Sequence, residues 1–288
     1  CRRNDLPPQP TAVYTLGAIL YGRGDYEQCL RLMSSIADVE SAVGQGASLY
    51  AGKCYARLGD TDAAAMAFDR AYRMDFDSRA TESALYGYAA ARTRGGRIPF
   101  SSSVPLLEEY LRRFPDASNT ADVREYLATA YYNEKDYAKA WQSISRIKNP
   151  DARMLAARQK VAYEYGAETL AAGDAAKAAE YLRVAADMTR QDAAIARQAR
   201  FWLADALYAQ GKYSQAQTEY NAFLAGEPRS ADRTLAIYDL AYSLYMQRRY
   251  ADAAHRFAEA MSARPALPSE LNTDAALRRA DCLYYSGS

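Results

Sequence analysis

One stretch of the sequence, RQARFWLADALYAQGKYSQAQTEYNAFLAGEP at residues 197–228, predicts two short helices joined by a tight turn at Gly211. Small residues stand where two packed helices must touch, Ala204 in the first helix and Ala216 in the second. Large apolar side chains flank these positions, and Pro228 ends the unit. Since one helical hairpin cannot bury its own apolar stripe, this hairpin requires neighbours built on the same plan.

The same order of large and small positions recurs along the chain. It resembles the tetratricopeptide repeat (TPR), a helix–turn–helix module of roughly 34 residues. The resemblance implies an all-α fold, an α-α superhelix (TPR solenoid) of about seven helix–turn–helix repeats plus a terminal helix. We expect residues 1–10 to form an irregular, proline-rich lead-in and residues 11–288 to form a single solenoid, a fragment of a longer chain. The repeats are expected near 11–40, 45–78, 81–117, 121–150, 152–190, 195–229 and 233–266, and the final helix at 273–285.

Short polar pairs mark the turns inside the repeats. They are Gly24-Asp25, Gly59-Asp60, Lys135-Asp136, Gly173-Asp174 and Gly211-Lys212. In the second repeat, Asp60 or Thr61 is expected to cap the helix that follows. The third repeat is irregular, because a longer connection from Arg92 to Val104 replaces the tight turn.

Residues 81–170 carry a narrower resemblance. The segment PFSSSVPLLEEYLRRFPDASNTADVREYLATAYYNEKDYAKAWQSISRIKNPDARML and the long helix predicted after it are similar to the large multi-repeat exported TPR proteins of Bacteroidetes. This resemblance implies a periplasmic or exported protein, with an outer-membrane association as one option, and a scaffolding role. It supplies no catalytic residues. Cys1 is either a lipid-bearing lipoprotein cysteine or an arbitrary start of the chain.

Composition narrows the classes of partner. The chain has 36 basic and 35 acidic residues, a net charge of +1, so no net field attracts nucleic acid or an anionic membrane. No apolar run approaches the ~18 residues of a membrane span, so we expect no direct membrane insertion. The spacing of the four cysteines matches no metal knuckle, and Cys29 and Cys54 fall on core positions as buried free thiols. Tyrosine is abundant, with 25 residues against 7 Phe and 2 Trp.

No stretch carries the residues of a catalytic, cofactor or metal site. The single histidine, His255, is expected on an exposed helix face, and no His/Cys/Asp/Glu cluster has zinc spacing. The sequence GASLYAGKC at residues 46–54 superficially resembles a phosphate-binding loop. However, its glycine spacing is wrong, Cys54 replaces Ser/Thr, and Gly52 fits a packing position within a helix. We therefore expect neither an enzyme nor a cofactor.

The exposed positions of the first helices are expected to line a concave face rich in aromatic residues. Tyrosine and arginine often anchor protein interfaces, although many of these rings could instead fill seams between repeats. We expect this face to bind a protein or peptide, and the alternative is a saccharide stacked on the rings. The terminal helix lacks a following partner and is a candidate for self-association. The candidate binding residues are Lys53, Arg57, Tyr88, Tyr132, Tyr163, Phe201, Asp205, Tyr208, Tyr238, Tyr242, Tyr245 and Tyr284.

Overall fold

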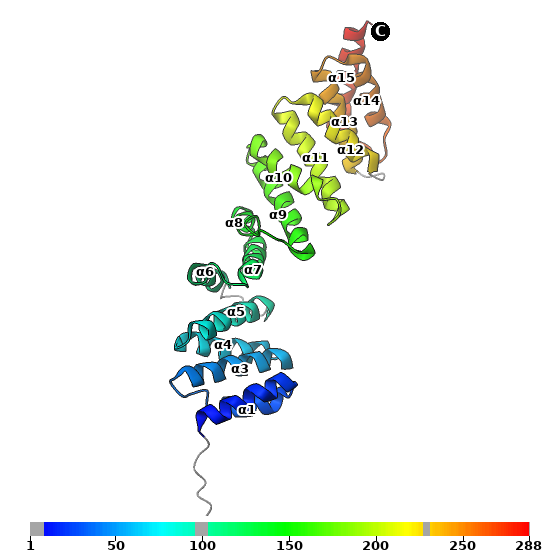
Figure 1. Cartoon of the computed structure of the whole chain (residues 1–288). Coiled ribbons are helices and arrows are strands. Elements are labelled where there is room, and N and C mark those ends of the chain that lie inside the picture. Colours follow the sequence, from blue (N-terminus) through cyan, green and yellow to red (C-terminus); the bar gives the residue numbers. More distant parts are fainter. Residues whose placement is uncertain (1–8, 96–102, 227–230, 288) are drawn as a thin grey trace, which may run out of the picture. The chain divides into compact units, whose positions relative to one another are not determined.

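The computed structural model describes residues 9–95, 103–226 and 231–287, and these residues form fifteen α-helices (Figure 1). The chain divides into two compact units, residues 1–148 and 149–288. The first unit holds α1 (Pro10–Arg23), α2 (Tyr26–Ser34), α3 (Ala42–Leu58), α4 (Thr61–Met74), α5 (Ser78–Gly95), α6 (Val104–Arg113), α7 (Thr120–Asn133) and α8 (Tyr137–Ile144). The second holds α9 (Ala152–Ala171), α10 (Ala175–Asp187), α11 (Ala193–Ala209), α12 (Tyr213–Gly226), α13 (Ala231–Met246), α14 (Tyr250–Ser262) and α15 (Ser269–Ser286).

Within each unit, every helix packs on the next one in the sequence. The odd-numbered helices also contact one another, α1 with α3 and α3 with α5 in the first unit, α9 with α11 and α11 with α13 in the second. The even-numbered helices make no comparable contact among themselves in the described residues. The odd-numbered helices therefore form the inner layer of each unit, and their exposed side is called the inner face below. The predicted fold of seven helical hairpins and a terminal helix is confirmed.

Glycine supplies most of the tight turns inside the hairpins. Gly59 has a φ of 87°, a left-handed conformation that costs glycine little, and Asp60 then accepts a hydrogen bond from the Ala63 backbone N–H at 3.0 Å. Asp60 is thus the cap of α4, as predicted. Lys135 and Arg248 occupy the equivalent turns of two other hairpins with φ values of 61° and 60°. These two residues adopt the left-handed conformation although they have a Cβ atom, which is unfavourable.

Small residues in the inner helices let large residues of the outer helices approach. A Cβ atom on Gly52 of α3 would lie 2.6 Å from the Phe68 ring of α4, and one on Gly166 of α9 would lie 2.6 Å from Leu182 of α10. Ala204 of α11 is likewise fully buried. Gly52 lies inside a helix, which removes the phosphate-loop alternative.

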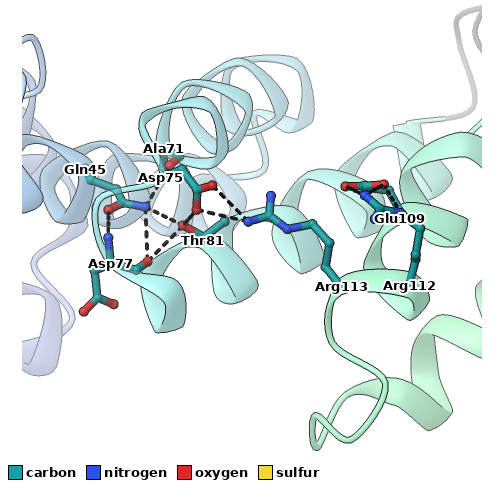
Figure 2. A network of polar contacts seen from close by, with 8 residues as sticks. All are labelled: Gln45, Ala71, Asp75, Asp77, Thr81, Glu109, Arg112 and Arg113. Atoms are coloured by element: carbon teal, nitrogen blue, oxygen red, sulfur yellow. Dashed lines mark hydrogen bonds and ion pairs between the residues drawn. The ribbon is translucent and has the colours of Figure 1, made fainter.

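A buried glutamine ties three helices of the first unit together (Figure 2). Gln45 of α3 donates from Nε2 to the carbonyl oxygens of Ala71 (3.1 Å) and Asp77 (3.4 Å). The same nitrogen donates to Thr81 Oγ1 at 2.9 Å, and Oε1 accepts from the Asp77 backbone N–H at 2.7 Å. Thr81 in turn donates to the Asp75 carboxylate at 2.7 Å. This network joins the end of α4 to the start of α5, so it fixes the junction between two hairpins.

The same device recurs in the second unit with one bond fewer. Gln159 of α9 donates from Nε2 to the carbonyl oxygens of Ala185 (3.1 Å), Met188 (3.0 Å) and Asp192 (2.9 Å). Its Oε1 is buried and accepts no hydrogen bond from the residues that the structure describes. Gln159 therefore leaves one buried polar atom unsatisfied, a cost that Gln45 of the first unit avoids.

Several boundaries differ from the sequence-based expectation. Helix α1 begins at Pro10, because proline fits the first helical turn, so residue 10 does not belong to the lead-in. Helix α5 continues through Arg92 to Gly95, and the remaining connection, residues 96–102, lies outside the described residues, as does Cys1. Helix α15 begins at Ser269, directly after Pro268, rather than near residue 273.

Cys29, Cys54 and His255 lie as predicted. Cys29 and Cys54 are free and fully buried. Burial and the Cys29 thiol raise the pKa of Cys54 to about 12, so it stays protonated and poorly nucleophilic at neutral pH. His255 is exposed on α14.

Candidate functional site

The structure sorts the predicted binding residues by exposure. Arg57 and Tyr284 are exposed, whereas Phe201 and Tyr238 are buried. The other eight are half-buried on inner helices: Lys53, Tyr88, Tyr132, Tyr163, Asp205, Tyr208, Tyr242 and Tyr245. Half-buried positions combine a fixed rotamer with a face available to a partner. The first three residues are therefore candidates on the inner face of the first unit, and the other five on that of the second unit.

Phe201 and Tyr238 pack inside the hairpins instead of facing a partner. The Phe201 ring lies 5.4 Å from that of Phe223, centroid to centroid, and the Tyr238 ring lies 6.0 Å from that of Phe257. Both residues sit on the side of their inner helix that meets the outer helix of the same hairpin. The sequence alone could not distinguish positions on this buried side of the helix from the neighbouring exposed positions.

A polar cluster joins α13 to α15 on the inner side of the second unit. The hydroxyl groups of Tyr238 and Tyr242 both donate to Asp274 Oδ2, the former at 2.8 Å. Arg278 donates from Nε to the Tyr242 hydroxyl oxygen at 3.2 Å and from Nη1 to Asp281 at 3.0 Å. Burial raises the pKa of Asp274, but the two tyrosine hydroxyls and Arg278 outweigh it, and the net shift is downward. Asp274 is therefore a charged, internally satisfied carboxylate.

Two further carboxylates of the same unit are not satisfied in this way. Asp205 on α11 accepts a hydrogen bond from the Tyr220 hydroxyl at 2.5 Å, and Asp239 on α13 accepts none from the described residues. Burial raises the pKa of Asp205 to about 6. Burial and then the charge of Asp205 raise that of Asp239 to about 8. Within the described residues, no salt bridge joins a cation to either carboxylate.

The first unit carries the opposite charge on its inner face. The Lys53 ammonium lies 5.2 Å from the centroid of the Tyr50 ring, and burial lowers its pKa. No carboxylate among the described residues pairs with Lys53. Tyr50 also contacts the rings of Tyr14 (5.8 Å) and Tyr21 (5.3 Å) edge-on. This helix therefore presents a cation within a tyrosine cluster.

Sequence reasoning missed Asp239, Asp274 and Arg278. A usable signal existed for Asp239, which is the one charged residue within the apolar run TLAIYDLAYSLY at residues 234–245. A carboxylate placed in such a run must be buried against the core or aimed into a groove. Asp274 and Arg278 carried no comparable signal, because charged residues are common on exposed helices.

Other site classes find no support in the part of the chain that the structure describes. Within it, no helix combines the length and the apolar character that crossing a bilayer requires. Residues 9–95, 103–226 and 231–287 also contain no group of three or more His, Cys, Asp or Glu side chains suited to holding a metal ion.

Comparisons with known proteins agree with the observed packing. Residues 14–80 and 198–230 match tetratricopeptide repeat family models. No curated protein matched the sequence. Among solved structures, the TPR2AB-domain:pHSP90 complex of yeast Sti1 is 14% identical, with a TM-score of 0.50 over 97% of this chain and 98% of that one. The Naa15/Naa10 complex bound to HypK-THB is 17% identical, with a TM-score of 0.51 over 98% of this chain and 42% of the other.

A tetratricopeptide repeat protein from Parabacteroides merdae is 12% identical, with a TM-score of 0.47 over 94% of this chain and 98% of that one. Identities at this level bear on the fold alone. The helix pairing, the left-handed turns and the small inner-helix residues agree with the family matches over both segments. The chain is therefore similar to tetratricopeptide repeat proteins over residues 14–80 and 198–230, and its described helices pack in sequence as in an all-α, TPR-like superhelix.

Proposed function

We propose that this protein is a non-enzymatic scaffold that binds a protein segment or peptide on its tyrosine-rich inner face. Tetratricopeptide repeats typically serve protein–protein interaction, and the Sti1 domain of similar fold was solved in a complex with pHSP90. The observation that carries the proposal is the set of half-buried tyrosines on adjacent inner helices, Tyr208 on α11 with Tyr242 and Tyr245 on α13.

These tyrosines suit an interface for a physical reason. The Tyr242 ring lies 6.4 Å from that of Tyr245, edge-on, and Tyr245 lies 5.6 Å from Tyr250 in the same manner. Rings held by neighbouring rings lose little further rotamer freedom on binding, so each buried ring contributes more net affinity. The hydroxyl groups of Tyr208 and Tyr245 can donate hydrogen bonds to the backbone of an extended segment, whereas that of Tyr242 already donates to Asp274.

The direct test is cross-linking and affinity capture from the native cell envelope, followed by binding measurements with the captured partner. Tyr208→Ala combined with Tyr245→Ala is expected to weaken binding at least tenfold. His255→Ala, on the outer helix of the same repeat as Tyr245, is the matched control and should leave affinity unchanged. Equal effects of inner and outer substitutions would contradict the proposal.

The competing function is saccharide binding, for which the exposed rings of Tyr284 and Tyr285 on α15 provide stacking surfaces. Their exposed fractions are 82% and 59%. A glycan array separates the two proposals. No binding to any glycan on the array, together with capture of a protein, supports the scaffold function. Saturable sugar binding that is lost in Tyr284→Ala supports saccharide binding.

We propose a periplasmic or exported location, with outer-membrane association as an option, on the basis of the resemblance of residues 81–170. Fractionation of the native cell against cytosolic and periplasmic marker proteins tests this location. Recovery with the cytosolic marker would contradict it.

We also propose that α15 mediates self-association. Leu277, Tyr284 and Tyr285 give this helix a large exposed apolar surface, which in a soluble protein typically marks an interaction site. Sedimentation at rising concentration should show dimers that disappear in Leu277→Ser combined with Tyr284→Ser. A strictly monomeric protein at all concentrations would contradict this role.

A further inference from the structure

We propose that α15 of one copy of this chain is covered by α1 of a second copy, so that the copies associate head to tail. This inference rests on the self-association proposed above and names the surface that meets α15. The two helices belong to different units of the chain, and each presents an apolar side to solvent.

The exposed side of α15 is the side on which an outer helix packs in a complete hairpin. Counting back from the left-handed turn glycine of each helix, Leu277 of α15 takes the position of Phe201 in α11, and Leu283 takes that of Leu207. Phe201 and Leu207 are buried, and the Phe201 ring packs on Phe223 of the outer helix α12. Leu277 and Leu283 are instead 61% and 36% exposed. Among the described residues, α15 therefore lacks the cover that α12 gives to α11.

The exposed side of α1 has the residue pattern of an outer helix. The buried side of α12 has a small residue followed by large ones four and seven positions later: Ala216, Tyr220 and Phe223. Helix α1 repeats this spacing in Ala12, Leu16 and Ile19, and here Leu16 is 51% and Ile19 48% exposed. The other side of α1 packs on α2, where Gly17 meets the Met33 side chain. Helix α1 thus has a free side that is built like the buried side of an outer helix.

The α11–α12 hairpin supplies the geometry for seating α1 on α15. Its two helices are joined by a tight turn and run antiparallel, and the Phe201 ring contacts two rings of α12, with centroids 6.2 Å and 5.4 Å away. In the same arrangement between two copies, Leu16 and Ile19 of one chain would cover Leu277 of the other. Each of these side chains would exchange water for an apolar neighbour, which favours association.

The charges at one end of the two exposed sides are complementary. Arg23 ends α1 four residues after Ile19, and Glu270 lies in the first turn of α15, seven residues before Leu277. Antiparallel seating brings these ends together. Both charged side chains are exposed, and neither forms an ion pair among the described residues. A second copy therefore supplies both the apolar cover and the opposite charge, which fix the direction of docking.

The contact joins two different surfaces, so it does not close on itself and further copies can add at either end. One pair of helices buries less area than the ~1,600 Å² of a standard stable interface. We therefore expect weak, reversible association that grows with protein concentration.

The decisive experiment mixes two variants that are altered on different surfaces. Leu16→Ser combined with Ile19→Ser removes the α1 side, and Leu277→Ser combined with Tyr284→Ser removes the α15 side. Since all four side chains are exposed, both variants should fold, which melting curves verify. In sedimentation velocity each variant alone should stay monomeric at concentrations where the wild type associates. An equimolar mixture should contain a 1:1 dimer and nothing larger, because only one intact surface of each kind remains.

The outcomes distinguish this contact from self-association in general. If the α1 variant associates as strongly as the wild type while the α15 variant is monomeric, α15 pairs with a surface other than α1, and only the head-to-tail contact is overturned. A mixture that stays monomeric would also overturn it. A wild-type chain that is monomeric at every concentration would contradict both the contact and the proposed self-association.

A charge exchange tests the antiparallel seating. Arg23→Glu or Glu270→Arg alone should weaken association about fivefold, because each places like charges together. A chain with both substitutions restores one charge of each sign at every contact and should associate within about twofold of the wild type. Arg31→Glu, at an exposed position of α2, is the matched control and should have no effect. A double variant that associates no better than the single ones would overturn the seating.

Discussion

The inner faces of the two units carry the same kind of aromatic surface and opposite charges. Helix α3 presents Lys53 among Tyr14, Tyr21 and Tyr50, whereas α11 and α13 present Asp205 and Asp239 among tyrosines. The pKa of Lys53 is lowered and that of Asp239 is raised, in each case chiefly by burial. Neither group forms a salt bridge among the described residues, and the raised pKa of Asp239 leaves it mostly protonated near pH 7.

This difference in ionisable groups shows which positions of a repeat can vary from one unit to the other. The small inner-helix residue and the turn are constrained by packing, so both units share them. The inner-face positions are constrained only by partial burial, so each unit can place a different charge there. An unpaired, partly desolvated charge lowers the stability of its own unit, and a partner of opposite charge would recover that loss.

The largest expected effect on stability concerns the small residues of the inner helices, which both units share. Gly52→Leu in the first unit and Ala204→Leu in the second should each destabilise by about 1–3 kcal/mol through overpacking, and lower the melting temperature by roughly 3–10 °C. Thermal melts followed by circular dichroism measure this effect. Ala209→Leu, an exposed position on α11, is the control. Unchanged melts for Gly52→Leu and Ala204→Leu would break the packing scheme in both units.

The next largest effect on stability should differ between the two buried glutamines, Gln45 and Gln159. Gln45→Ala removes the acceptor of the Asp77 N–H as well as three donated bonds, and should cost about 2–3 kcal/mol. Gln159→Ala removes donated bonds only, and also removes the unsatisfied Oε1, so its cost should be about 1–2 kcal/mol. Chemical denaturation measures both costs. A larger loss for Gln159→Ala would reverse this comparison.

A pH-dependent effect between about pH 4 and 8 is expected from two carboxylates of the second unit. The folded-state pKa of Asp239 is about 8 and that of Asp205 about 6, both above the ordinary value for aspartate near 3.9. Between about pH 4 and 8 the folded state therefore binds more protons than the unfolded state, and stability falls as pH rises.

Asp239→Asn removes the larger share of this dependence. It should raise the melting temperature by about 2–5 °C at pH 8 and change it little at pH 5. Melts of the wild type and the variant across this pH range measure the effect. The same gain at pH 5 and pH 8 would show that the charge of Asp239 is not responsible.

The smallest effect concerns two hairpin turns that the described residues form without glycine, one in each unit. Lys135→Gly and Arg248→Gly should each stabilise the protein by about 0.5–1 kcal/mol, because glycine adopts their φ values of 61° and 60° more readily. Denaturation midpoints measure the gain. A loss at both positions would indicate that the side chains contribute contacts that outweigh the backbone preference.

The fold was largely predictable from the sequence, because turn residues and small packing positions act locally. Gly59-Asp60 fixes its turn through a φ value and a cap, and both are encoded by adjacent residues. The site was only partly predictable. Phe201 lies on an inner helix but is buried, because a rotation of that helix by a fraction of a turn decides whether a position contacts the outer helix or faces a partner. Asp274 acquires its role only through tyrosines on another helix.

The central claim is that partners bind along the inner helices, and hydrogen–deuterium exchange with the captured partner tests it most directly. On saturation with this partner, the account predicts slower amide exchange in α11 and α13 and unchanged exchange in α12 and α14. Slower exchange confined to α12 and α14, with α11 and α13 unaffected, would contradict it.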